Sequence, residues 1–131
     1  MQTTAIEVRP IRSGAERKAF LALPHELYKN DPAWVPPLDM EQRDLMNPGR
    51  NPFFEHAEAE FFAAWRDGKM VGRISAQIDR EYLRIHQRQV GFFGFFECID
   101  DAEVARTLLQ TAEAWLRQRG MQSVQGPFTL S

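Results

Sequence analysis

Residues 90–99 read Val90-Gly91-Phe92-Phe93-Gly94-Phe95-Phe96-Glu97-Cys98-Ile99, and apolar side chains occupy both alternating positions of this run. A strand that is apolar on both faces is typical of a central position covered on both sides. We therefore predict a central strand over these ten residues. Gly91 and Gly94 stand among the aromatic residues and indicate a bulge, or a close approach of another chain segment or of a ligand.

A long amphipathic helix is predicted directly after this strand, from Asp101 to Arg119. Its apolar stripe consists of Val104, Leu108, Ala112, Trp115 and Leu116, and Gly120 is a suitable helix stop. A further strand is predicted over 123–128. Because a strand, helix and strand in this order form a right-handed crossover, the two strands are expected to be parallel.

Two more strands precede the central one. Residues 57–65 and 70–78 alternate apolar and polar positions, and Asp67-Gly68 between them is a hairpin signal. The pattern predicts three consecutive antiparallel strands, 57–65, 70–78 and 90–99. The polar residues 80–89 between the last two are predicted to form a solvated loop with a small basic surplus.

The amino-terminal part predicts one strand and two helices. Residues 6–12 alternate as a strand, and Pro10 places that strand at or near an edge because proline donates no ladder hydrogen bond. Ser13 and Glu16 form a capping box for a helix over 15–28. Pro24 inside this helix predicts a kink or a break near Leu23.

The rest of this part is short and rich in proline. Residues 38–46 predict the second helix, ended by Asn47-Pro48-Gly49. The segment Trp34-Val35-Pro36-Pro37 is expected to clamp the first helix to the sheet, with a ligand wall as the alternative.

Composition limits the class of protein. The chain has 131 residues, which suits a single domain over 1–131, and its 16 Lys and Arg against 18 Asp and Glu exclude a basic surplus for nucleic acid. No apolar run reaches the length of roughly 18 residues that a membrane span needs. One cysteine, Cys98, excludes internal disulfides. We expect a soluble cytoplasmic protein that binds neither nucleic acid nor membrane.

Four stretches carry a family resemblance: residues 31–38, 51–57, 90–97 and 126–128. With the element order, they resemble a group of uncharacterised bacterial GNAT-like proteins of the N-acetyltransferase superfamily. The resemblance implies an α/β (α+β) fold with a mixed, mostly antiparallel sheet and helices on both faces. Members of that group are longer, so we expect an amino-terminal piece that lacks the last helix and strands of the fold.

The resemblance also implies a reaction. It is acyl transfer from acetyl-CoA or another acyl-CoA to a small-molecule or peptide amine, by a GNAT-type N-acyltransferase. Glu97, at the end of the central strand, matches the position of the carboxylate that takes the proton of the attacking amine. Glu58 and Glu60 on the neighbouring strand are alternative bases.

The cofactor-binding residues implied by the resemblance lie on the central strand and on the helix after it. Backbone groups of Phe95, Phe96 and Cys98 would hold the pantetheine arm. Only Val104 and Ala105 fit the family's pyrophosphate motif, Arg/Gln-x-x-Gly-x-Gly/Ala, whose glycines let backbone N–H groups approach the anion.

The other motif positions are acidic. Asp100 stands at the Arg/Gln position, Glu103 stands at the key glycine, and Asp101 lies between them. A carboxylate at ~5 Å from a phosphate charge repels it by roughly 1 kcal/mol in water and about 3 kcal/mol at an effective dielectric of about 20. Two interpretations stay open: an enzyme whose CoA site lies largely elsewhere, or a non-catalytic GNAT-like domain that supports or binds a partner.

Other functional groups are assigned to structure. The three histidines lack the spacing of a metal site, so no metal is expected. The apolar neighbours of Cys98 favour a core cysteine over a nucleophile. The strand over 123–128 would leave one side unpaired, which predicts a homodimer through this C-terminal strand edge.

Overall fold

The structure is a computed structural model, and it describes residues 5–36 and 39–128. Pro37 and Leu38, which belong to the predicted proline-rich segment and second helix, lie outside the described residues. The elements are β1 (Glu7–Pro10), α1 (Gly14–Leu27), α2 (Asp39–Met46), a 3-10 turn (Pro52–Glu55), β2 (Ala57–Arg66), β3 (Lys69–Asp79), α3 (Arg80–His86), β4 (Val90–Cys98), α4 (Ala102–Gln118) and β5 (Ser123–Gln125).

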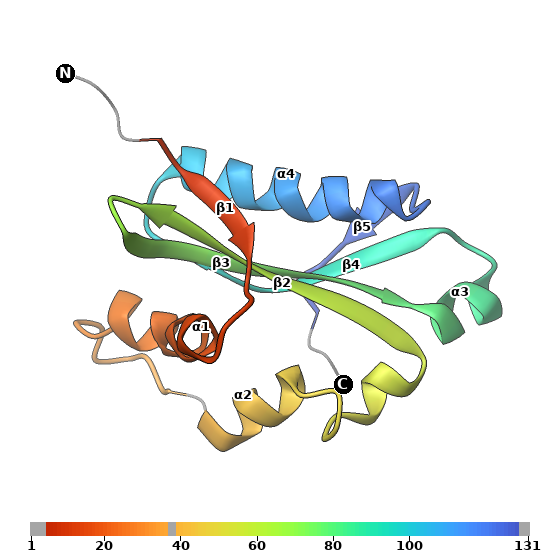
Figure 1. Ribbon diagram of the computed structural model, residues 1–131, viewed down its shortest axis with the longest axis horizontal. Coiled ribbons are helices and arrows are strands. Elements are labelled where there is room, and N and C mark those ends of the chain that lie inside the picture. The colour runs from red at the N-terminus through yellow and green to blue at the C-terminus, as the bar shows by residue number, and fades with distance from the viewer. Residues whose placement is uncertain (1–4, 37–38, 129–131) are drawn as a thin grey trace.

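The five strands form one sheet in the order β1-β2-β3-β4-β5. The first three pairings are antiparallel and β4 pairs with β5 in parallel. Figure 1 shows α4 on one face of this sheet and α1 with α2 on the other. The predicted mixed sheet with helices on both faces is confirmed, and β1 lies at an edge as Pro10 indicated.

The β2–β3 hairpin turns at Asp67 and Gly68, which adopt φ angles of 54° and 74°. Positive φ at both central residues is the conformation that a tight hairpin turn needs, and Asp and Gly adopt it readily. The predicted hairpin is therefore confirmed. It makes β3 the middle strand of the sheet, and all nine of its residues from Met70 to Ile78 are buried.

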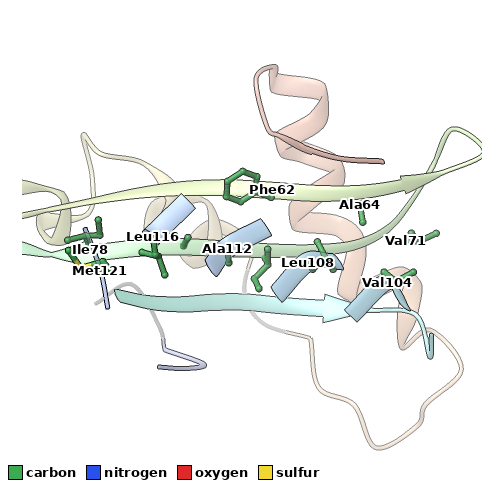
Figure 2. Close-up of a cluster of buried hydrophobic side chains, with 11 residues drawn as sticks. Phe62, Ala64, Val71, Ile78, Val104, Leu108, Ala112, Leu116 and Met121 are labelled. Carbon is green, nitrogen blue, oxygen red and sulfur yellow. The ribbon is translucent and has the colours of Figure 1, made fainter. Parts of the chain in front are cut away.

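The larger core lies between the sheet and α4. Val104, Leu108, Ala112 and Leu116 of the helix are at most 1% exposed, and they point toward side chains of β2 and β3 such as Phe62, Val71 and Ile78 (Figure 2). The predicted apolar stripe is confirmed, except that Trp115 is only partly buried at the margin of this core. Fully burying such a side chain stabilises the fold by about 1.5–3 kcal/mol.

A smaller core lies on the opposite face, under α1 and α2. Phe20, Leu23 and Met46 of these helices pack against Ala63 and Met70 of the sheet. Helix α1 passes through Pro24 to Leu27, so the predicted break near Leu23 is wrong. Proline leaves the carbonyl of Phe20 without its helical donor, and the buried side chain of Arg73 donates to that oxygen instead, at 2.7 Å.

The connection after β3 is also different from the prediction. Residues 80–86 form the helix α3 rather than a loop. The carboxylate of Asp79 caps this helix by accepting hydrogen bonds from the N–H groups of Glu81 and Tyr82 at 3.1 and 3.2 Å. Tyr82 packs on Phe92 of β4 with ring centroids 5.0 Å apart, which anchors the helix to the sheet.

A bulge interrupts β4. Arg73 of β3 pairs with Glu97, and Ser75 pairs with Gly94, so β4 has one residue more than β3 over this span. Phe95 sits in the bulge with a φ of 50°. The bulge indicated by the glycines is thus present, one residue beyond Gly94.

The chain itself uses the space left by both glycines. A Cβ atom on Gly91 would lie 2.5 Å from Cδ2 of Leu116 in α4, and a Cβ atom on Gly94 would overlap the carbonyl oxygen of Phe128. The strand β5 ends at Gln125, short of the predicted Phe128, yet the N–H of Phe128 still donates to the carbonyl of Phe93 at 2.8 Å. Pairing of two copies through the outer edge of β5 stays a prediction.

We predict that Gly94→Ala destabilises the fold by about 1–3 kcal/mol, because the new methyl group forces residues 126–128 away from β4. Thermal unfolding followed by circular dichroism measures the change. Gly14→Ala is the matched control, since no atom lies within 4 Å of a Cβ there. Equal unfolding temperatures for the two variants would contradict the close contact.

Candidate functional site

Glu97 lies at the end of β4, beyond the bulge, and its carboxylate meets the C-terminal end of α1. The hydroxyl of Tyr28, the residue that caps α1, donates to Oε2 of Glu97 at 2.5 Å. The two residues are 69 positions apart in the sequence. The packing of α1 across the sheet therefore brings them together.

Trp34 closes this side of the site. Its ring stacks on Tyr28 with centroids 5.4 Å apart and meets His25 edge-on at 5.3 Å. Trp34 thus packs on the end of α1, and a clamp of this helix to the sheet by the segment stays a prediction. Val35, next to Trp34, is 81% exposed and takes no part in this packing.

Arg73 lies beside Glu97 on the same face of the sheet, since the two are direct partners across β3 and β4. Its guanidinium is 5% exposed and donates from Nε to the carbonyl of Phe95 at 3.0 Å, besides its bond to Phe20. Burial lowers the pKa of Arg73 to about 10, and the charge of Glu97 opposes that shift. The site thus holds a buried cation next to its carboxylate at neutral pH.

Tyr28 is held in its neutral form. The hydrogen bond to Glu97, together with burial and the carboxylate charge, raises the pKa of Tyr28 to about 12. Ionised tyrosinate could not donate this bond and would face a carboxylate. Tyr28 therefore fixes the orientation of the Glu97 carboxylate.

An open hollow of about 660 Å³ adjoins this pair, between the end of α1 and the start of α4. Its wall consists of Leu27, Tyr28, Cys98, Ile99, Asp100, Asp101, Ala102 and Ala105. Two of the predicted cofactor residues, Cys98 and Ala105, line it. Burial, with the nearby carboxylates, raises the pKa of the Cys98 thiol, which disfavours the nucleophilic thiolate.

The start of α4 is closed by its own cap. Oδ1 of Asp101 accepts from the N–H groups of Glu103 and Val104 at 2.9 and 3.4 Å, and Oδ2 accepts from Arg66 at 3.0 Å. Arg66 lowers the pKa of the Asp101 carboxyl. The N–H groups that a pyrophosphate would need are thus occupied, and the residues present here do not fit that anion.

The remaining predicted cofactor residues are spread over both faces of the sheet. The ring of Phe95 packs on Phe20 of α1 with centroids 5.6 Å apart, and Phe96 packs on Phe93 at 6.1 Å in the core under α4. The side chain of Val104 is fully buried in that same core. Val104 could therefore contact a ligand only through its backbone, whereas Phe95 and Phe96 are half-buried.

The alternative bases are held in ion pairs. Glu60 accepts a two-point contact from Arg12 at 2.9 and 3.0 Å, and Glu58 lies 3.2 Å from a guanidinium nitrogen of Arg80. Both carboxylates lie on β2, away from the hollow beside Tyr28. The geometry favours Glu97 over both.

No cluster of three or more metal-ligating side chains occurs within residues 5–36 and 39–128. His56 instead pairs with Asp79, at 2.9 Å between Nδ1 and Oδ1. In the same described ranges, no helix is long and apolar enough to span a bilayer.

Sequence reasoning missed two members of this cluster. Tyr28 reads as an apolar position of α1, and Arg73 reads as a polar position of a hairpin strand. Only the contact of α1 with the β3–β4 region joins them to Glu97. The one usable signal was Arg73 itself, since a charge flanked by Gly72 and Ile74 in a nine-residue buried run requires partners.

The family model described as "Acetyltransferase (GNAT) family" matches residues 22–126. The chain belongs to the GNAT acetyltransferase family, and the resemblance seen in its sequence is confirmed.

Relatives refine this assignment. The "Bacterial ceramide synthase" of Caulobacter vibrioides (strain NA1000 / CB15N) is 46% identical over 127 residues. That alignment covers 96% of this chain and 33% of the relative. The chain thus spans about a third of this curated relative, which agrees with the expected amino-terminal part.

Two solved structures share the fold. FeeM, an N-acyl amino acid synthase from uncultured soil microbes, superposes with a TM-score of 0.63 at 12% identity, covering 91% of this chain and 68% of that one. The aminoglycoside N-acetyltransferase AAC(6')-Iy in complex with CoA gives 0.61 at 14% identity, covering 98% and 80%. At these identities the likeness extends to the fold alone.

We predict that Tyr28 titrates at about pH 12 and that Glu97→Gln returns its pKa toward the ordinary 10.0. The stabilisation from this hydrogen bond is complete below pH 10 and is lost as pH rises through 12, because the folded-state pKa is the raised one. Ultraviolet absorbance of tyrosinate measures it in a Tyr82→Phe background, which leaves Tyr28 alone of the two tyrosines. A midpoint near pH 10 with Glu97 intact would contradict the contact.

A second prediction concerns the start of α4. The chain should bind CoA weakly or not at all there, and the combined change Asp100→Gln, Asp101→Gly and Glu103→Gly should strengthen binding by freeing N–H groups and removing three charges. Isothermal titration with acetyl-CoA measures the difference, and circular dichroism checks that α4 is retained. Low-micromolar binding by the unchanged chain would overturn the electrostatic argument.

Proposed function

We propose that this chain supplies the catalytic carboxylate of an N-acyltransferase that moves an acyl group from a thioester, acyl-CoA in the first instance, to an amine. The observation that carries the proposal is the hydrogen bond between Tyr28, which lines the hollow, and Glu97 at the bulged end of β4. One relative supports the reaction type, since the protein that is 46% identical over 127 residues is named a bacterial ceramide synthase, a name that denotes an amide formed on an amine.

The outer edge of β4 is a suitable place for the acyl donor. Beyond the bulge, the N–H of Ile99 donates to Val71 on the β3 side, so the backbone groups of Cys98 and Phe96 point to the other side because strand residues alternate. Among the described residues, β5 pairs only with Val90 to Phe92. We assign the backbone groups of Phe96 and Cys98 on this side to an extended amide-bearing arm, whereas the carbonyl of Phe95 already accepts from Arg73.

The chemistry assigned to Glu97 is proton removal. The amine nitrogen attacks the thioester carbonyl, the C–N bond forms, the C–S bond breaks, and the nitrogen gives up a proton while the thiolate gains one. Glu97 accepts the proton of the amine, directly or through one water. Arg73 places a buried positive charge beside the Glu97 carboxylate.

A second candidate function rests on a different observation. Asp101 occupies the N–H groups at the start of α4, which favours a GNAT-like domain that supports a catalytic partner region without binding CoA phosphates itself. The two candidates differ in one property. Only the first requires Glu97 for turnover.

We predict that Glu97→Gln lowers kcat for acyl transfer by about 10²–10⁴-fold with little change in the KM of the thioester, since the loss is that of a general base. Release of free thiol from an acyl-CoA in the presence of a panel of amines provides the assay. Glu60→Gln is the matched control, because its carboxylate is engaged with Arg12. Unchanged kcat in Glu97→Gln would favour the support function.

A further inference from the structure

A second hollow, of about 480 Å³, lies on the flank of α1 that faces α2. Figure 1 shows these two helices together on the face of the sheet opposite α4. One stripe of α1 and a single residue of α2 line it: Gly14, Arg17, Lys18, Leu21, Ala22, His25 and Arg43. The stripe follows from helical spacing, since residues three and four apart share a face.

The charged residues that line this hollow are all basic. Arg17, Lys18 and Arg43 are exposed, no acidic residue is among its lining residues, and within the described ranges no carboxylate forms an ion pair with any of the three. Three unneutralised cations around one concavity, in a chain of net charge −2, attract an anion.

The floor of the hollow is apolar. Leu21 is half-buried and Ala22 lies beside it, so the ends of the cations surround aliphatic surface. Met40 shares the α2 face of Arg43, three residues away, and is 74% exposed. An inorganic anion would leave this apolar surface in water, whereas a ligand with a hydrocarbon part would cover it.

We propose that this hollow binds a single-chain amphiphile with an anionic head, a carboxylate or a phosphate. The head lies against Arg17, Lys18 and Arg43, and the chain lies along Leu21 and Ala22. The site is separate from Glu97, because the rings of Trp34 and Tyr28 stand between His25 and that carboxylate. The inference therefore does not depend on the proposed acyl transfer.

The test uses dodecyl phosphate below its micelle concentration, with inorganic phosphate and dodecyltrimethylammonium for comparison, in isothermal titrations of the protein. We expect saturable one-to-one binding of dodecyl phosphate that weakens with salt. Inorganic phosphate should bind at least about tenfold more weakly, and the cationic amphiphile should not bind. The double variant Arg17→Glu with Arg43→Glu should lose about tenfold or more in affinity.

Arg84→Glu with Arg106→Glu is the matched control, since both residues are exposed and lie on α3 and α4, outside the hollow. Circular dichroism verifies the fold of each variant. Equal affinity in the two double variants, equal binding of inorganic and dodecyl phosphate, or adsorption to anionic vesicles without binding of the monomeric amphiphile would each overturn the proposal. Glu97→Gln should bind dodecyl phosphate unchanged, which separates this result from the outcome of the acyl-transfer assay.

Discussion

The buried guanidinium of Arg73 is the interaction on which the functional face of the molecule depends. It donates to Phe20 in α1 and to Phe95 in the bulge of β4, two carbonyls that have lost regular partners, one to Pro24 and one to the extra residue of the bulge. The guanidinium carbon of Arg73 also lies 5.0 Å from the ring centroid of Phe20 and 5.3 Å from that of Phe95. Without it, two buried acceptors would be unsatisfied, at about 1–3 kcal/mol each. The side chain of Arg73 thus supplies the hydrogen bonds that the proline in α1 and the bulge in β4 would otherwise leave unmade.

This coupling explains where the candidate site lies. The bulge sets the direction of the end of β4 that carries Glu97, and α1, fixed by the same guanidinium, delivers Tyr28 to that carboxylate. The start of α4 is built differently: Asp101 satisfies its N–H groups and Arg66 balances the charge. The half of the site to which we assign proton transfer is therefore assembled, while the half that would hold a pyrophosphate is filled by the protein's own carboxylate.

The sequence predicted the sheet well because each strand is marked locally, by alternation in β2 and β3 and by aromatic residues on both sides of β4. The predictions were wrong where tertiary contacts override a local sequence signal. Pro24 does not end α1, since Arg73 replaces the missing hydrogen bond, and residues 80–86 form a helix because Asp79 caps them and Tyr82 packs on Phe92. Glu97 could be named from its place on the strand, but Tyr28 is 69 residues distant and carries no sequence signal of that contact.

The strand order has a consequence for how the chain folds. In space, β2, β3 and β4 follow one another as they do along the chain, so each pairing can extend from the connection that precedes it, with low loop-closure entropy. In contrast, α1 and α2 lie between β1 and β2 in the sequence. Pairing of β1 with β2 therefore closes a long loop and forms only four residue pairs. Native-state hydrogen exchange should consequently be slowest in β3, and β1 should open first.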